Sequence, residues 1–155
     1  MIIKKIYVDT SVFGGYFDEE FSADTIPFFE KIISNDIAIV ASETLETEIY
    51  KAPPFVIDFF ESLDNISRIK LTDAVKKLAE KYIEEKVVGK TSLADCRHIA
   101  TATIHNVDVL VSWNFKHIVN LERIKGYNSI NLREGYKMIE IRTPKEIFNY
   151  ENNNE

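Results

Sequence analysis

The 155 residues suffice for one domain with a buried core, which we expect to span residues 1–150, and a composition of 45% hydrophobic and 28% charged residues is ordinary for a soluble globular protein. The net charge of −6, from 25 acidic and 19 basic residues, argues against a non-specific nucleic-acid binder unless basic residues gather locally or a metal neutralises the carboxylates. No apolar stretch approaches the roughly 18–20 residues of a membrane helix. The single cysteine, Cys96, excludes an internal disulfide and fits a reducing cytoplasm.

The first half of the chain predicts strands that alternate with helices. Its opening is too short and too rich in β-branched residues for a signal peptide and predicts a strand instead. Pro27 falls in the first turn of the following helix, where a missing N–H does little harm. The expected elements are a strand at 2–8, a break at Gly14 and Gly15, a helix at 24–33, a buried strand at 37–41, a helix capped by Ser42 and stopped by Pro53 and Pro54, and a helix through Phe60.

The second half continues this alternation. We expect a weak extended segment at 66–71, helices at 72–87 and 93–105, a buried strand at 108–112, extended segments at 129–132 and 138–142, a short helix from Pro144 and a disordered tail at 151–155. Short apolar strands between helices favour right-handed crossovers. The sequence therefore predicts a three-layer α/β/α sandwich with a central, mainly parallel sheet.

Four polar residues stand where such a fold places chemistry, near the carboxyl ends of strands or early in helices. Asp9 closes the first strand, Glu48 lies about two turns into the helix after the second, Asp95 lies in the first turn of a helix, and Asn114 follows the strand at 108–112. A parallel sheet can bring them together. They are our candidates for a catalytic and metal-binding site.

Each candidate also has a purely structural explanation. Asp9 and Asn114 are common turn residues, and Glu48 is equally at home as a solvated helix charge. Ser92 and Asp95 have the spacing of a capping box, which would stabilise a helix start without catalysis.

Further residues allow two interpretations. His98, one turn after Asp95, is a ligand, a base or, more commonly, a structural histidine, and Trp113 is more often a packing residue than a base-stacking one. Cys96 is most simply a small buried residue. The stretch from 113 to 137 is either a local phosphate-binding surface or a scattered solvated face, with basic residues Lys116, Arg123, Lys125, Arg133 and Lys137.

Four segments, in order, resemble the motifs of the PIN-domain family over roughly residues 2–132. These are residues 7–13 (YVDTSVF), 42–49 (SETLETEI), 93–102 (LADCRHIATA) and 110–115 (LVSWNF). The sequence departs from the family at Asn114, where many members have Asp.

The resemblance implies a Mg²⁺- or Mn²⁺-dependent endoribonuclease, with Asp9, Glu48, Asp95 and Asn114 at the metal. Hard cations prefer oxygen ligands, and a divalent metal activates water and stabilises charge on phosphate. Two carboxylates about 4 Å apart repel by roughly 4 kcal/mol at an effective dielectric near 20, so converging carboxylates suit a cation. Asn114 offers only a neutral oxygen, and we expect it to weaken metal binding.

Small members of the family imply the toxin of a toxin–antitoxin pair (VapC-type), with RNA as substrate, a small antitoxin as partner and a homodimer as assembly. Two alternatives stay open: a housekeeping ribonuclease without an antitoxin, and a non-enzymatic binding module with a degenerate site. A receiver-like phospho-acceptor domain fits poorly, because Asp9 precedes Thr10 rather than a second acidic residue.

Overall fold

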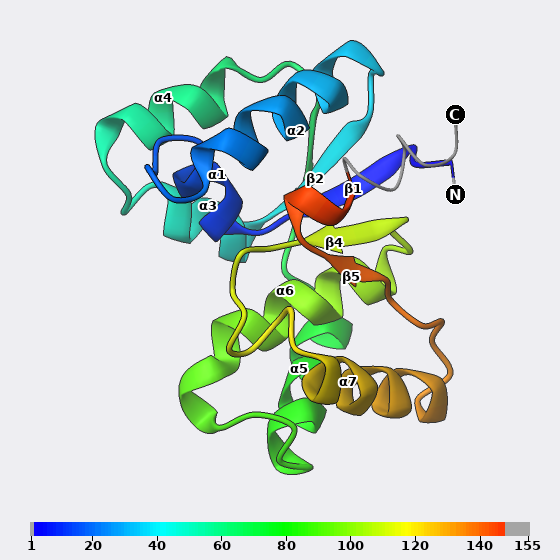
Figure 1. Ribbon diagram of the computed structural model, residues 1–155. Coiled ribbons are helices and arrows are strands. Elements are labelled where there is room, and N and C mark those ends of the chain that lie inside the picture. Colours follow the sequence, from blue (N-terminus) through cyan, green and yellow to red (C-terminus); the bar gives the residue numbers. More distant parts are fainter. Residues whose placement is uncertain (1, 148–155) are drawn as a thin grey trace.

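The computed structural model describes residues 2–147, which form a sheet covered by helices on both faces (Figure 1). The expected tail at 151–155 lies outside the described residues. The elements, in chain order, are β1 (Lys5–Val8), α1 (Thr10–Gly15), α2 (Ser22–Ser34), β2 (Ala38–Ser42), α3 (Glu43–Ile49), α4 (Pro54–Ser62), β3 (Ile66–Ile69), α5 (Asp73–Glu84), the 3₁₀ turn η1 (Lys90–Ser92), α6 (Leu93–Ile104), β4 (Val109–Val111), α7 (Leu121–Arg133) and β5 (Ile141–Arg142).

The five strands lie in the order β3-β2-β1-β4-β5, and all four pairings are parallel. The chain moves outward from β1 through β2 to β3, then returns to the other side of β1 with β4. The strand order therefore reverses between β1 and β4, the place where open α/β sheets form their binding sites.

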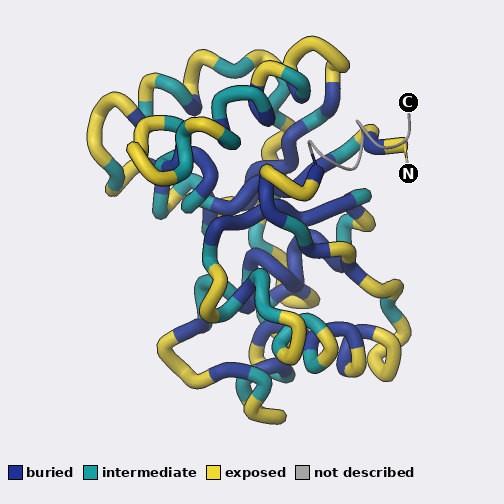
Figure 2. The backbone as a smooth tube through the Cα atoms, viewed as in Figure 1, coloured by how far each residue is buried: buried dark blue, intermediate teal, exposed yellow. Residues whose placement is uncertain are grey.

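Alternating strand residues belong to two separate hydrophobic cores, one on each face of the sheet, because successive side chains of a strand point to opposite faces. In β1, Ile6 and Val8 pack with α1, α2 and α4, whereas Tyr7 packs with α5, α6 and α7. Figure 2 shows the central strands β1, β2 and β4 as the most continuously buried part of the chain, whereas the edge strand β3 and the helices are partly exposed. The predicted three-layer α/β/α arrangement is confirmed.

Most predicted elements are present, including the cap of α3: the Ser42 hydroxyl accepts a hydrogen bond from Leu45 N at 3.0 Å. Residues 144–147 are helical, as the proline at 144 predicted. Two predictions were wrong. The glycines expected to break the chain form the end of α1, and residues 129–132, expected to be extended, lie inside α7.

Gly15 explains the first of these errors, because its missing side chain is required by packing rather than by a turn. A Cβ at Gly15 would lie 2.9 Å from the Trp113 ring and 3.1 Å from Thr25 Oγ1, while one at Gly14 would meet nothing within 4 Å. The Trp113 ring is itself held, since its Nε1 donates to Thr25 Oγ1 at 2.9 Å and its face stacks on Phe21.

These neighbouring glycines give a matched pair of variants. Gly15→Ala should lower the free energy of unfolding by about 1–3 kcal/mol through overpacking. Gly14→Ala should leave it unchanged or raise it by up to about 1 kcal/mol, because alanine is the better helix former. Urea unfolding of both variants measures the difference, and equal effects would contradict the packing argument.

Candidate functional site

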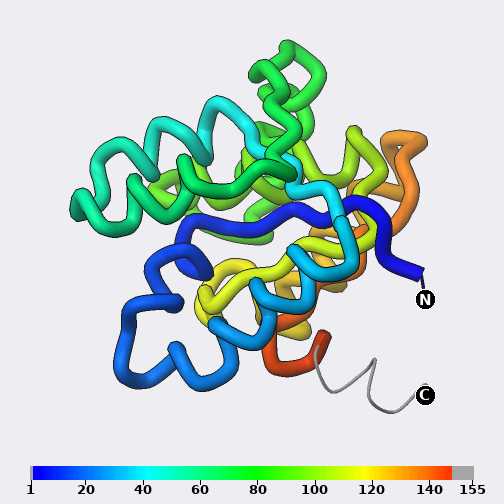
Figure 3. Tube along the Cα trace, turned by 90° about the horizontal axis from the view of Figure 1, so that it is seen from above, coloured from blue at the N-terminus to red at the C-terminus, as the bar shows by residue number. Residues whose placement is uncertain are grey.

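Asp9 lies at the reversal point of the sheet, directly after β1 and beside the residues that follow β4. It is 5% exposed, and its amide donates to Val111 O at 2.9 Å. Figures 1 and 3 both show the start of α1 close to the segment after β4. Two hydroxyls hold the carboxylate: Ser11 Oγ and Ser112 Oγ donate to Oδ2 at 2.7 and 2.8 Å.

Glu48, from α3, reaches the same point, and its Oε1 accepts a hydrogen bond from Thr10 Oγ1 at 2.9 Å and another from His98 Nε2. His98 Nε2 also lies 3.6 Å from Asp9 Oδ1. One ligand atom from each of Asp9, Glu48 and His98 lies within 4.8 Å of the others. We call these three residues the Asp9–Glu48–His98 group.

His98 is the member of this group for which the sequence favours a structural role. Its imidazole is fully buried, and Nδ1 lies 2.5 Å from the Tyr7 hydroxyl, which in turn lies 2.7 Å from Ser42 Oγ. The only available signal was its position one helical turn after Asp95. Both ring nitrogens are therefore hydrogen-bonded, which fixes the ring between the core and the two carboxylates.

The charges of the group shift its pKa values in opposite directions. Burial alone would lower the pKa of His98, but its hydrogen bond to Glu48 and the charges of Asp9, Glu48 and Asp95 raise it above the ordinary value. Burial alone would raise the pKa of Glu48, but the bond to His98, its charge and the Thr10 hydroxyl lower it. The arrangement favours an imidazolium beside an ionised carboxylate.

Asp95 stands next to this group without being part of the tight triangle. Burial raises the pKa of its carboxyl, and the negative charge of Asp9 raises it further, while His98 acts in the other direction. Asp95 therefore lies within the electrostatic field of the group. The capping box is not formed: Ser92 makes no side-chain cap bond, and its buried hydroxyl has no hydrogen-bond partner.

Asn114 adopts the turn arrangement considered for it. Its Oδ1 accepts from the backbone amides of Lys116 and His117 at 3.2 and 3.0 Å, and its own amide donates to Ser112 Oγ at 2.9 Å. It contacts the site through Ser112, the residue that holds Asp9. The structure brings Asp9, Glu48 and His98 together, with Asp95 beside them and Asn114 in the adjoining turn.

The basic stretch at 113–137 is partly neutralised within the fold. Arg133 forms ion pairs with Glu85 and Glu134, and the Arg123 guanidinium donates to Val87 O. This surface is therefore a weaker candidate for phosphate binding than the sequence indicated. Within residues 2–147 we also find no helix with the length and apolar character needed to span a bilayer.

No family model matches the sequence, and no curated protein does. Solved structures do match its fold. VapBC2 from Rickettsia felis, bound to a DNA fragment from its promoter, aligns with a TM-score of 0.58 and 15% identity over 90% of this chain and 98% of that one. FitAcB from Neisseria gonorrhoeae aligns at 0.57 and 11% identity, covering 90% and 97%. A toxin–antitoxin complex from Klebsiella pneumoniae aligns at 0.51 and 17%, covering 72% and 88%. At these identities the likeness concerns the fold, and the chain has the PIN-like fold that its motifs resemble.

Proposed function

We propose that this protein is a divalent-metal-dependent endoribonuclease, with Asp9, Glu48 and Asp95 as the carboxylates that hold Mg²⁺ or Mn²⁺. The observation that carries the proposal is the convergence of Asp9 and Glu48, from separate parts of the chain, at the reversal point of a PIN-like sheet. Asp95 adds a third negative charge within their field. We leave Asn114 Oδ1 out of the ligand set, because two backbone amides already bind it.

The hydrogen bonding of the two carboxylates fits a hard cation. In Asp9 both hydroxyl donors bind Oδ2, and in Glu48 both donors bind Oε1. Among the described residues, Asp9 Oδ1 and Glu48 Oε2 have no hydrogen-bond donor, so each carboxylate keeps one oxygen for a ligand. Oxygen donors from carboxylates are the ligands that Mg²⁺ and Mn²⁺ prefer.

The remaining residues of the site orient these ligands. Ser11 and Ser112 fix the Asp9 carboxylate, while Thr10 and His98 fix Glu48. We assign His98 a positioning role, because its Nε2 is bonded to Glu48 and its Nδ1 to Tyr7. A bound divalent metal would supply a water of lowered pKa and stabilise charge on the phosphate oxygens.

We further propose that the protein is the toxin of a toxin–antitoxin pair in the cytoplasm. The support is the fold shared with a chain of the Klebsiella pneumoniae complex described as toxin–antitoxin, and with VapBC2 and FitAcB. The same likeness motivates our expectation of a small antitoxin partner and of a homodimer. Co-purification with the product of a neighbouring gene would separate this role from that of a housekeeping ribonuclease.

Metal dependence tests the enzymatic proposal. The purified chain should cleave RNA internally in Mn²⁺ or Mg²⁺, lose this activity in EDTA and regain it when excess metal is returned. Gel analysis of an RNA labelled at its 5′ end measures both the activity and the internal position of the cut. Cleavage that persists in EDTA, or that no divalent metal supports, would contradict the proposal.

A further inference from the structure

Three buried polar residues form a hydrogen-bonded chain that ends at Glu48. Ser42 is 1% exposed, and Tyr7 and His98 are fully buried. Ser42 Oγ lies 2.7 Å from the Tyr7 hydroxyl, and that hydroxyl lies 2.5 Å from His98 Nδ1. The other ring nitrogen, His98 Nε2, donates to Glu48 Oε1. We call these residues the Ser42–Tyr7–His98 chain, which leads from the end of β2 through β1 and α6 to a carboxylate on α3.

The register of the sheet explains why the Tyr7 side chain reaches Ser42. Tyr7 pairs with Val40 in the parallel register of β1 and β2, and Ser42 lies two residues after Val40. Residues two apart on a strand share a face, so the Ser42 side chain points to the face on which Tyr7 and Val40 are packed. Helix α6 covers this face, and its residue His98 meets the Tyr7 hydroxyl there.

Ser42 also acts on Glu48 through the backbone. Its hydroxyl accepts a hydrogen bond from Leu45 N at 3.0 Å and so fixes the first turn of α3, the helix that carries Glu48. One hydroxyl therefore supports the backbone of Glu48 through α3, and its carboxylate through Tyr7 and His98. The contacts form a closed loop that begins and ends at the same part of the chain.

Fold stability alone gives little reason for this polar chain. A buried polar group is costly unless it is hydrogen-bonded, and replacing both partners of a buried hydrogen bond by apolar groups of the same shape is often nearly neutral. The core around Tyr7 is largely apolar. Burial raises the pKa of Tyr7 well above its ordinary value, the bond to Ser42 lowers it in part, and the charges of Asp9 and Glu48 raise it further. Tyr7 therefore stays a neutral hydroxyl that serves as a fixed hydrogen-bond partner.

We propose that Tyr7 is a positioning residue of the site, which acts through His98 to hold the Glu48 carboxylate in the orientation that binds a metal. This inference rests on the proposed function of Glu48 as a metal ligand. Residues that orient a ligating side chain affect metal affinity without touching the metal. Because Thr10 and His98 both donate to Oε1, an imidazole held in place by Tyr7 leaves Oε2 of Glu48 for the metal.

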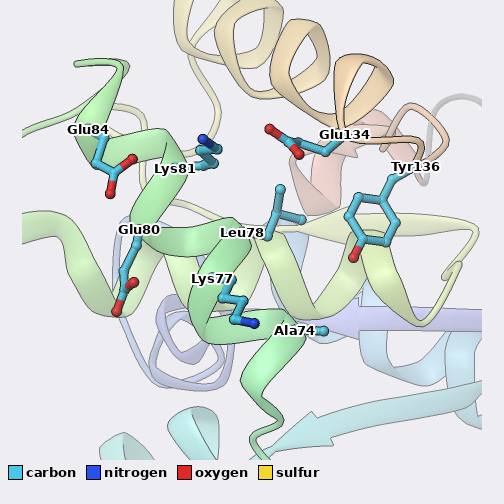
Figure 4. Close-up of a pocket in the computed structure, with 8 residues that line it drawn as sticks. All are labelled: Ala74, Lys77, Leu78, Glu80, Lys81, Glu84, Glu134 and Tyr136. Atoms are coloured by element: carbon cyan, nitrogen blue, oxygen red, sulfur yellow. The ribbon is translucent and has the colours of Figure 1, made fainter.

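Tyr82 offers a matched control within the same core. Its side chain is also fully buried, and its hydroxyl donates to Asn131 Oδ1, a contact between α5 and α7 that includes no residue of the site. Figure 4 shows other side chains of α5 around a hollow at the end of α7, and none of the residues that line it belongs to the Asp9–Glu48–His98 group. Tyr7→Phe and Tyr82→Phe therefore remove the same hydroxyl at two places, of which only the first leads to Glu48.

The proton on His98 Nε2 gives the first test, in the full chain kept free of metal by EDTA and labelled with ¹⁵N-histidine. Burial and the bond to Glu48 should protect this proton from exchange with water, so that its NMR resonance is sharp. The chain has three histidines, and His105→Gln and His117→Gln assign their signals. Tyr7→Phe should broaden or remove the resonance, because the ring loses one of its two partners. Tyr82→Phe should leave it unchanged.

The affinity for Mn²⁺ alone, measured by isothermal titration calorimetry, gives the second test. Tyr7→Phe should weaken Mn²⁺ binding by roughly 10–100-fold, as expected when a residue that orients a metal ligand is removed. Tyr82→Phe should bind Mn²⁺ like the parent. Ser42→Ala removes the partner of Tyr7 and keeps the tyrosine ring in the core, so it should weaken binding as well. It replaces Tyr7→Phe in both tests if circular dichroism shows that variant to be unfolded.

A His98 resonance as sharp in Tyr7→Phe as in the parent would overturn the inference, and so would equal losses of Mn²⁺ affinity in Tyr7→Phe and Tyr82→Phe. The two tests also separate the inference from the proposed function. A parent chain that binds no Mn²⁺ would reject the metal site, while the resonance would still decide whether Tyr7 holds His98. A parent that binds Mn²⁺ as tightly as Tyr7→Phe does would reject the positioning role alone.

Discussion

Asp9→Asn is expected to lower kcat/KM for RNA cleavage by more than the roughly 10–100-fold that is lost when a residue that only orients a metal ligand is removed. Asparagine has nearly the same volume, and its side-chain oxygen can still accept the hydroxyls of Ser11 and Ser112, so the fold should persist. The substitution removes the negative charge of Oδ1, the Asp9 oxygen that we propose as the metal ligand. This oxygen lies 3.6 Å from His98 Nε2. Initial cleavage rates at saturating Mn²⁺ measure the effect.

Asp58→Asn is the matched control, because Asp58 is exposed on α4 and outside the site. It removes the same charge from the chain and should leave cleavage unchanged. Circular dichroism of both variants shows whether they are folded. A folded Asp9→Asn protein that keeps more than a tenth of the parental activity would reject Asp9 as a metal ligand, whatever the control shows.

The layers and strands of this fold were predictable because they follow from hydrophobic pattern. Short apolar runs predicted β1, β2 and β4, and the capping residue Ser42 predicted the start of α3. The errors arose where contacts between distant segments override local preference. Gly15 is helical and lies against Trp113, nearly a hundred residues away in sequence. In α7, Asn131 accepts a hydrogen bond from the Tyr82 hydroxyl and so anchors a helix through residues that looked extended.

The candidate site was predictable to the extent that strand ends in a parallel sheet share one edge. That rule predicted that Asp9 and Glu48 would lie at the same point. It cannot predict how a helix is rotated about its own axis, which decides the side chains that face the site. Asp95 and His98 lie one turn apart on α6, and the packing of α6 against α5 and the sheet decides which of them enters the tight group. For Asn114 the sequence left both the turn role and the ligand role open, and the structure shows its Oδ1 bound to turn amides.

The largest expected effect on stability comes from His98→Ala, which should lower the free energy of unfolding by about 3–5 kcal/mol, the usual cost of truncating a large, fully buried ring to alanine. The fully buried imidazole bonds Glu48 and Tyr7 and faces Asp9 at 3.6 Å. Its loss leaves the carboxylates without their nearest positive charge and opens space in the core. Urea unfolding measures the change.

His105→Ala is the matched control, since it makes the same substitution at the end of the same helix. We expect it to lower the free energy of unfolding by less than about 1 kcal/mol, because His105 is only partly buried and its contact with Lys5 Nζ uses the backbone carbonyl.

A double-mutant cycle of His98→Ala with Glu48→Gln then isolates the interaction energy between His98 and Glu48, because glutamine keeps an acceptor for Thr10 and removes the charge. If His98 acts as the counter-charge of the site, His98→Ala should cost markedly less in the Glu48→Gln background. Equal costs in both backgrounds would mean that His98 and Glu48 do not stabilise each other, and the positioning role of His98 at Glu48 would be rejected.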